Sequence, residues 1–170
     1  MWKKLSRMNP GWKYTIISND YIVEMTGGSV CIKEKATDTV LKRFEGLNYV
    51  YTGDIRPDEL ECFALENGKH FYVYSLKKCE LIKKVTLPRF YESMFVCGFY
   101  SDDGKILNIP VQRWIDESPK GKRKYSKGYY EYALCKYETE QYSLIEKELI
   151  DGLDDYWLEN VHEIAKINAL

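Results

Sequence analysis

The stretch GDIRPDELECFALENGKHFYVYSLKKCELIKKV, residues 53–85, contains three short apolar runs separated by residues that favour turns. A turn-forming pair precedes each run: Pro57-Asp58, Asn67-Gly68 and Lys77-Lys78. Asn-Gly between two apolar runs is the strongest short-range signal for a β-hairpin, because a type I′ turn requires positive φ at both central residues. The stretch therefore predicts short strands joined by tight turns, and it indicates no particular chemistry.

The segment before this stretch repeats its pattern. Four strand-like runs precede residue 46: Trp12–Ser18, Tyr21–Met25, Ser29–Lys33 and Val40–Phe44. When each position is compared with the position numbered 41 higher, seven pairs agree in chemical type without a gap: Ile22/Phe63, Gly27/Gly68, Val30/Phe71, Ile32/Val73, Val40/Leu81, Leu41/Ile82 and Phe44/Val85. This agreement predicts an internal repeat rather than a chance spacing of turns.

A third copy follows, with an offset of 45 in sequence number. Four positions recur at that offset: Gly53/Gly98, Ile55/Tyr100, Asp58/Asp103 and Cys62/Leu107. Its predicted strands are Ser93–Tyr100, Lys105–Trp114, Gly128–Tyr137 and Tyr142–Leu149. Pro110 predicts an edge, a bulge or a bend within the second strand, because proline has no N–H to donate to a sheet. The offset grows to 61 between Leu81 and Tyr142, so this copy contains an insertion, residues 115–127.

After residue 150 the apolar residues recur at helical spacing. The apolar stripe consists of Trp157, Leu158, Val161, Ile164, Ala165 and Ile167. Asp154 is suited to cap the start of a helix, and Asp155 and Glu159 suit the positive end of its dipole. We predict an amphipathic α-helix of roughly fifteen residues within residues 151–170.

Four-strand copies of about 41 residues resemble the WD40-type and related β-propeller repeats. Residues 54–58 stand where such blades have their first turn, Asn67-Gly68 at the second turn, and residues 74–76 at the end of the third strand. No Gly-His pair opens a copy and no Trp-Asp pair closes a third strand, so the resemblance is to a generic propeller-like repeat. It implies a mainly β protein with three four-stranded antiparallel blades and a C-terminal amphipathic helix.

We expect residues 1–170 to form one domain. Its parts are an arm (1–11), blade 1 (12–45), blade 2 (46–87), blade 3 (88–149, with the basic insertion 115–127) and the C-terminal helix (151–170). Propellers close with about four to eight blades, so three blades leave two open edges. Three solutions stay open: two chains could form a six-bladed ring, the helix could cap an open fan, or the strands could curl into a barrel or sandwich.

The overall charge sets limits on partners and location. Twenty-five Lys and Arg residues balance 26 Asp and Glu residues, which argues against nucleic acid and anionic membranes as partners. No run approaches the roughly 18 apolar residues that span a bilayer. The five cysteines are widely spaced without a C-x-x-C pair, and the N-terminal residues do not resemble a signal peptide. We therefore expect a cytoplasmic protein with five reduced thiols.

The basic insertion is the one local feature that suggests a binding surface. Cations and aromatics are interleaved there, and we predict that these residues contact a partner: Lys120, Lys122, Arg123, Lys124, Tyr125, Lys127, Tyr129 and Tyr130. Residues 138–163 carry nine acidic side chains against one lysine, so the basic loop could also contact this acidic segment in its own chain or in a second copy of the chain. Without a binding role, the insertion would be a long loop that is charged because it is exposed to solvent.

We expect a non-enzymatic protein-interaction module or scaffold whose partner is a protein, with a second copy as one option. The two histidines, His70 and His162, stand in no metal-ligand spacing, so we expect no metal, no cofactor and no catalytic residues. Two alternatives remain. The first is a small carbohydrate-active or hydrolytic enzyme that uses loop carboxylates such as Asp54, Asp102 and Asp103, although turns alone explain them. The second is weak nucleic-acid binding by the basic loop.

Strand alternation and the repeat also predict the core. The residues expected to be buried are Ile22, Val30, Ile32, Phe63, Phe71, Val73, Leu81, Ile82 and Leu107.

Overall fold

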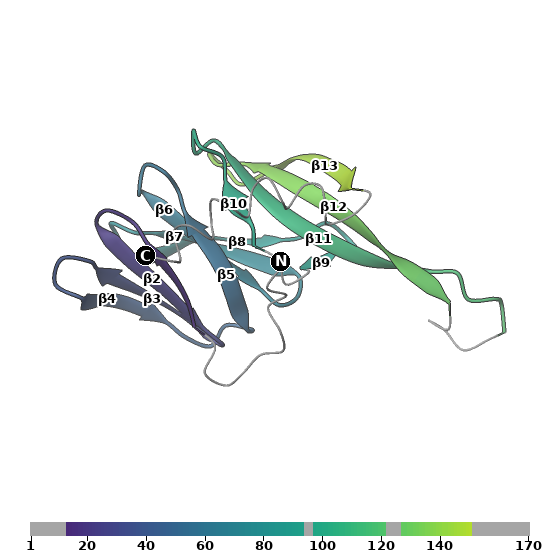
Figure 1. The fold of residues 1–170 in the computed structure, drawn as a ribbon, viewed down its shortest axis with the longest axis horizontal. Coiled ribbons are helices and arrows are strands. Elements are labelled where there is room, and N and C mark those ends of the chain that lie inside the picture. The colour runs from purple at the N-terminus through teal and green to yellow at the C-terminus, as the bar shows by residue number, and fades with distance from the viewer. Residues whose placement is uncertain (1–12, 94–96, 122–126, 151–170) are drawn as a thin grey trace, which may run out of the picture.

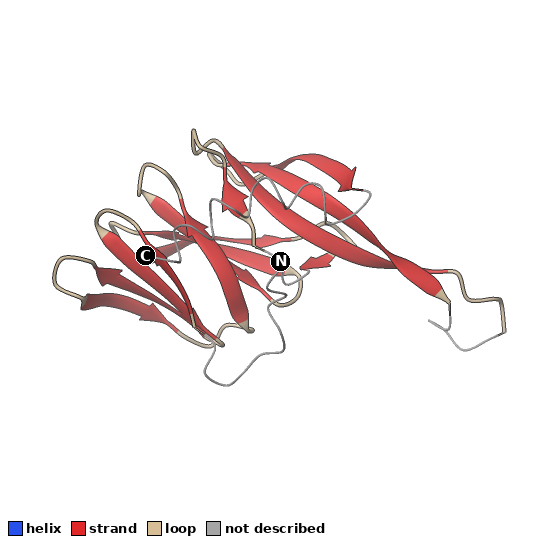
Figure 2. Ribbon diagram, viewed as in Figure 1, coloured by secondary structure: helices blue, strands red, loops and turns tan. Residues whose placement is uncertain are grey.

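The computed structural model describes residues 13–93, 97–121 and 127–150. Within these ranges the regular elements are strands (Figure 2). The predicted arm (1–11) and the predicted C-terminal helix (151–170) lie outside the described residues.

The strands form three separate antiparallel sheets, which we call blades 1 to 3 (Figure 1). Blade 1 contains β1 (Tyr14–Ile17), β2 (Tyr21–Thr26), β3 (Ser29–Glu34) and β4 (Thr39–Phe44). Blade 2 contains β5 (Val50–Ile55), β6 (Glu61–Glu66), β7 (His70–Ser75) and β8 (Glu80–Thr86). Blade 3 contains β9 (Glu92–Ser93), β10 (Phe99–Tyr100), β11 (Ile106–Asp116), β12 (Gly128–Glu138) and β13 (Leu144–Ile150). Three sheets in this arrangement fit propeller-like blades, and the described strands form neither one barrel nor a two-sheet sandwich.

The blades are arranged as a fan. Their first strands lie together, since β5 contacts β1 on one side and β10 on the other. Their last strands, β4, β8 and β13, face solvent along most of their length. In blades 1 and 2, the turn between the second and third strands accepts hydrogen bonds from the segment that follows the blade's last strand. These bonds are Leu47 N to Gly28 O and Val50 N to Gly27 O in blade 1, and Leu87 N to Lys69 O and Ser93 N to Gly68 O in blade 2.

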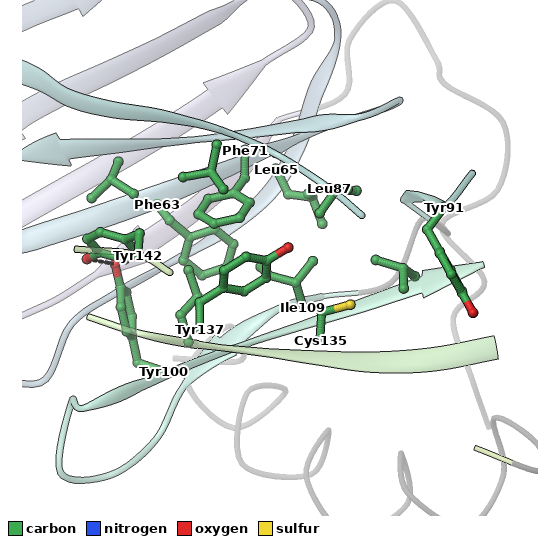
Figure 3. Close-up of a cluster of buried hydrophobic side chains, with 14 of the residues drawn as sticks. Phe63, Leu65, Phe71, Leu87, Tyr91, Tyr100, Ile109, Cys135, Tyr137 and Tyr142 are labelled. Carbon is green, nitrogen blue, oxygen red and sulfur yellow. Dashed lines mark hydrogen bonds between the residues drawn. The ribbon is translucent and has the colours of Figure 1, made fainter. Parts of the chain in front are cut away.

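Two apolar cores fill the spaces between the blades. The core between blades 1 and 2 is formed largely by Val23, Met25, Val30, Ile32, Cys62, Ala64, Tyr72 and Tyr74. The core between blades 2 and 3 contains Phe63, Leu65, Phe71, Val73, Leu107, Ile109, Cys135 and Tyr137 (Figure 3). Both faces of β6 and β7 are therefore covered, which makes blade 2 the centre of the fold.

Burial confirms most of the predicted core. Six of its residues have no accessible surface: Val30, Ile32, Phe63, Phe71, Val73 and Leu107. The prediction was wrong for Leu81 and Ile82, which are 48% and 44% exposed, because β8 is the outer edge of its blade and no strand lies beyond it.

Ile22 is only half-buried, and its predicted equivalence with Phe63 was wrong because the repeat has one residue more in blade 2. The β2–β3 turn has two residues between Thr26 and Ser29, whereas Leu65 pairs with Phe71 across a longer loop. Strand β2 therefore aligns with β6 at an offset of 40 rather than 41 in sequence number, and Val23, not Ile22, is the counterpart of Phe63.

The last strand of each blade contains a β-bulge at an equivalent position, and these bulges show how blade 3 aligns with the other two. The register shifts at Leu41 in β4, at Ile82 in β8 and at Ile145 in β13. A residue with positive φ lies three positions earlier in each case: Asp38, Cys79 and Tyr142. Tyr142 is thus the counterpart of Cys79, at an offset of 63 in sequence number, and the predicted offset of 61 was wrong. Bulges of this kind protect exposed sheet edges from pairing with other chains.

The first strand predicted for blade 3, Ser93–Tyr100, is interrupted. Strand β9 pairs with Val111 and Gln112 of β11, while β10 pairs with Leu107 and Asn108. Pro110 lies between the two paired parts, where the sequence predicted an irregularity.

The cysteines agree with the prediction: all five are free, and Cys31, Cys62 and Cys135 are buried.

Candidate interaction surface

Strands β11 and β12 pair over eleven residues each, from Ile106↔Glu138 to Asp116↔Gly128. The corresponding strands of blade 2 have six. Strand β9 pairs with β11 only at residues 111–112, and β13 pairs with β12 only from residue 132 onward. Residues 113–116 and 128–131 therefore form a two-stranded segment that projects from the fan, and we call it the ribbon (Figure 1). No strand in the described part of the chain pairs with either edge of it.

One face of the ribbon, turned away from blade 2, carries aromatic side chains. Trp114 and Tyr130 are in edge-to-face contact, with ring centroids 5.1 Å apart, and Tyr130 stacks on Tyr132 at 6.4 Å. Gly128 permits this packing, since a Cβ at that position would lie 2.7 Å from the Trp114 ring and 2.2 Å from the carbonyl oxygen of Ile115. Tyr130 is 44% exposed, so the row presents an aromatic surface to solvent.

The opposite face is anchored at its base to the segment that follows blade 2. The Arg113 guanidinium donates two hydrogen bonds to Glu131, at 2.7 and 3.0 Å, and the Tyr91 hydroxyl donates to the same carboxylate. Lys147 Nζ donates to the Tyr91 hydroxyl at 3.3 Å, and the Arg113 and Lys147 cations lie 5.1 and 4.6 Å from the Tyr91 ring centroid. These contacts fix the direction in which the ribbon leaves the blade.

The anchor also shifts acid–base equilibria. Burial, together with the hydrogen bond to Glu131, raises the pKa of Tyr91 to about 12. Hydrogen bonds from Arg113 and then Tyr91 lower the pKa of Glu131. The anchor therefore keeps its charged carboxylate and neutral phenol throughout the neutral pH range.

The structure describes half of the predicted partner-binding residues. Lys120 and Lys127 are exposed at the far end of the hairpin, and Lys127 Nζ lies 3.9 Å from the Glu117 carboxylate. Tyr129 and Tyr130 pair with Ile115 and Trp114, so strand alternation places them on opposite faces of the ribbon. The other four predicted residues lie outside the described part of the chain: Lys122, Arg123, Lys124 and Tyr125.

The sequence analysis did not predict several residues of this surface. Trp114 and Tyr132 could have been found from the alternation of β11 and β12, since they share a face with Tyr130. The contact between Tyr91 and Glu131 joins positions 40 residues apart. No local pattern predicts such a contact.

Two carboxylates that the enzyme alternative relies on, Asp54 and Asp103, accept hydrogen bonds that hold the local backbone. Asp54 accepts hydrogen bonds from the N–H groups of Ile55 (2.8 Å) and Tyr100 (3.0 Å), and it thereby joins β5 to β10. Its burial raises its pKa to about 6. Asp103 accepts from Ser101 Oγ and Lys105 N within the β10–β11 turn, next to exposed Asp102. A shallow pocket on blade 1 contains none of these residues; its lining is Asn19, Asp20, Tyr21, Glu34, Ala36 and Leu41.

A second polar cluster lies at the β6–β7 turn, and the sequence did not reveal it. The Glu66 carboxylate is buried; His70 Nδ1 lies 2.5 Å from it, and the Tyr72 hydroxyl donates to it at 2.8 Å. Burial and the hydrogen bond to Glu66 raise the pKa of Tyr72 to about 12. The three side chains lie on the face of blade 2 that meets blade 1. Their contacts connect the end of β6 to the start of β7.

Among the described residues, no group of three or more His, Cys, Asp or Glu side chains is placed to hold a metal ion. The same part of the chain contains no helix that could span a membrane.

Similarity to known proteins lies in the fold. No protein-family model and no curated protein matches the chain. Among solved structures it is similar to the tricorn protease (12% identity, TM-score 0.55, 77% of this chain and 12% of that one). It is also similar to the dihydro-heme d1 dehydrogenase NirN (13%, 0.51, 88% and 26%) and to hydrazine synthase from Kuenenia stuttgartiensis (11%, 0.50, 88% and 53%).

These similarities include β-propeller proteins, in agreement with the three antiparallel sheets, two of four strands and one of five. The chain spans about half or less of the length of each of these proteins. At such identities the similarity shows a propeller-like fold and carries no information about activity or ligand.

Proposed function

We propose that the chain is a non-enzymatic protein-interaction module and that the ribbon and the basic insertion (residues 115–127) contact an acidic segment of a partner protein. The observation that carries this proposal is the projection of the ribbon beyond its blade with aromatic side chains on its surface. A two-stranded hairpin is marginal on its own in water. The Tyr91 anchor nevertheless holds this one outward.

The side chains present are those that protein interfaces favour. Tyrosine, tryptophan and arginine are enriched among the residues that dominate the binding energy of interfaces. Tyrosine and tryptophan also bury large areas at small cost in conformational entropy. Cations around Lys120 and Lys127 would steer an acidic partner toward the aromatic row. The nearly neutral whole chain argues against nucleic acid as that partner.

The five free cysteines support a cytoplasmic location.

Affinity capture with the full-length chain tests the proposal. The reference protein is compared with a Lys120→Glu/Lys127→Glu variant and with a Tyr130→Ser variant, in extract with and without nuclease treatment. We expect a set of proteins that the reference chain retains and both ribbon variants lose, and we expect the purified partner to bind the reference chain directly.

The matched control is Lys77→Glu/Lys78→Glu, which makes the same charge change at an exposed turn between β7 and β8. It should retain the partners. If the ribbon variants capture the same proteins as the reference chain, the ribbon is not the contact surface. Loss of capture in every sample on nuclease treatment would indicate nucleic acid instead, and a self-associated chain of doubled mass would indicate a second copy.

A further inference from the structure

The outward face of blade 3, on the side away from blade 2, is apolar at its centre. Pro110 and Leu134 pair with each other there, and both are buried. Leu134 has no accessible surface, yet it belongs to neither of the cores between the blades. In the described part of the chain, no strand of blade 1 or blade 2 pairs with a strand of blade 3.

The apolar surface continues from the blade onto the ribbon. Tyr132, Tyr130 and Trp114 follow Leu134 on the same face, and the strip down to Gly128 is about 20 Å long at about 3.3 Å per residue. The indole Nε1 of Trp114 is buried and has no hydrogen-bond partner among the residues that the structure describes. A buried polar group of this kind calls for an acceptor from elsewhere.

The chain itself leaves the described structure beside this strip. Strand β13 ends at Ile150, which pairs with Tyr132. Twenty residues follow, with the apolar stripe that begins at Trp157 and five acidic side chains against one lysine. A helix of about fifteen residues is about 22 Å long, which matches the strip. The corresponding face of blade 1 carries the ion pair between Glu24 and Lys33 (3.2 Å) and is a poorer match for an apolar stripe.

We propose that residues 151–170 bind the outward face of blade 3, over Leu134 and the aromatic row, so that the chain occupies part of its own interaction surface. The regulatory meaning of this contact rests on the proposed function: a partner that uses the aromatic face has to displace the segment. The contact itself does not require a partner and can be measured without one.

Site-specific photo-cross-linking in the full-length chain tests the contact. The photoreactive p-benzoylphenylalanine is placed at Tyr130, where an aromatic ring is kept, and in a separate protein at Tyr129. The two positions are neighbours of similar exposure, 44% and 52%, on opposite faces of the ribbon. We expect cross-links from position 130 to peptides of residues 151–170, in a product of monomer mass whose yield does not depend on protein concentration, and few from position 129.

Three results would overturn the proposal: no cross-link from position 130 to this segment, equal yields from both positions, or products of dimer mass only. A second comparison uses sequence positions within the segment. Leu158→Asp places a charge on the apolar stripe and should lower the yield from position 130 by about tenfold, whereas Asn160→Asp makes the same charge change off the stripe and should leave it unchanged. Equal yields for the two variants would also reject the contact. Failure to find an external partner would leave these results intact, so the two proposals fail separately.

Discussion

Blade 2 and the outward faces of blades 1 and 3 differ at equivalent positions. Blade 2 is covered on both sides, and its eight central positions on β6 and β7 are apolar and buried: Cys62, Ala64, Tyr72, Tyr74, Phe63, Leu65, Phe71 and Val73. The equivalent outward positions of blade 1 are Ile22, Glu24, Cys31 and Lys33, and those of blade 3 are Asn108, Pro110, Leu134 and Lys136. Three of these eight outward positions, Glu24, Lys33 and Lys136, are charged, whereas none of the eight in blade 2 is.

This difference shows how an open array of repeats is ended. Repeat proteins need terminal units with polar outer faces to stay soluble. Lys33 pairs with Glu24, and Lys136 pairs with Glu146 and Glu148 at 2.9 and 3.0 Å. A six-bladed ring of two chains would bury these charges, and burial of ion pairs costs desolvation energy. The outward faces therefore favour a fan that ends at blades 1 and 3.

The largest expected effect is in the core of blade 2. Phe63 makes edge-to-face contacts with Phe71 and Tyr100, at centroid distances of 6.4 and 5.6 Å. Phe63→Ala should lower the free energy of unfolding by about 3–5 kcal/mol, because it leaves a cavity between two blades. Ile22→Ala, on the outward face of blade 1, should cost about 1 kcal/mol. Urea denaturation measures both, and equal losses would mean that the two faces are equally covered.

Glycine positions should show the same contrast. A Cβ on Gly53 would lie 2.0 Å from the Phe63 carbonyl oxygen and 2.3 Å from Met25 Cε of blade 1. Gly53→Ala should therefore cost about 3 kcal/mol, because a backbone atom cannot move aside. Gly46 lies after blade 1 with φ of 75°, and a Cβ added there would meet no atom within 4 Å, so Gly46→Ala should cost about 1–2 kcal/mol from backbone strain alone. Thermal and urea unfolding of the pair test this order; a larger loss at Gly46 would contradict it.

The pH dependence of stability should have opposite signs in the two regions. Burial raises the pKa of Asp54 from 3.8 to about 6, so its contribution to stability is full below pH 3.8 and is lost as the pH rises to about 6. Relative to Asp54→Asn, the unmodified chain should lose about 2–3 kcal/mol across that window.

The outward carboxylate Glu24 should show the reverse. Burial alone would raise its pKa, but hydrogen bonds from Lys13 and Lys33 outweigh it and lower the pKa. Stability relative to Glu24→Gln should therefore fall as the pH drops through the acidic range. Denaturation series between pH 3 and 7 measure both slopes, and slopes of the same sign would contradict the contrast.

The smallest effects are expected at the bulges of the outer strands. Leu41, Ile82 and Ile145 are 43%, 44% and 56% exposed at equivalent positions. Each change to threonine should alter the free energy of unfolding by less than about 0.5 kcal/mol, since these side chains lie at the exposed edges of their sheets. A loss above that at one blade alone would reveal a contact that covers its edge.

The ribbon shows how far the candidate site could be predicted. The basic run and the tyrosines at 129 and 130 mark an unusual segment in the sequence, and strand alternation indicates that neighbouring tyrosines point in opposite directions. Their environment could not be predicted, because the anchor depends on Tyr91 from the end of blade 2 and Lys147 from β13. Likewise, nothing local indicates that Glu66 is buried between Tyr72 and His70.

By itself the sequence determined the strands, their turns and the repeat, because each depends on residues within a few positions of one another. The equivalence of Gly27 and Gly68, the break between β6 and β7 at Asn67-Gly68 and the burial of Val30, Phe71 and Val73 follow from that local chemistry. The prediction of a type I′ turn at Asn67-Gly68 was wrong, because Asn67 does not have the positive φ that this turn requires. Only the tertiary structure decided which of two apolar faces is covered, as the exposure of Leu81 and Ile82 shows. Alternation determines which side chains share a face of a strand. Whether another sheet lies against that face depends on chain segments far away in the sequence, in a neighbouring blade.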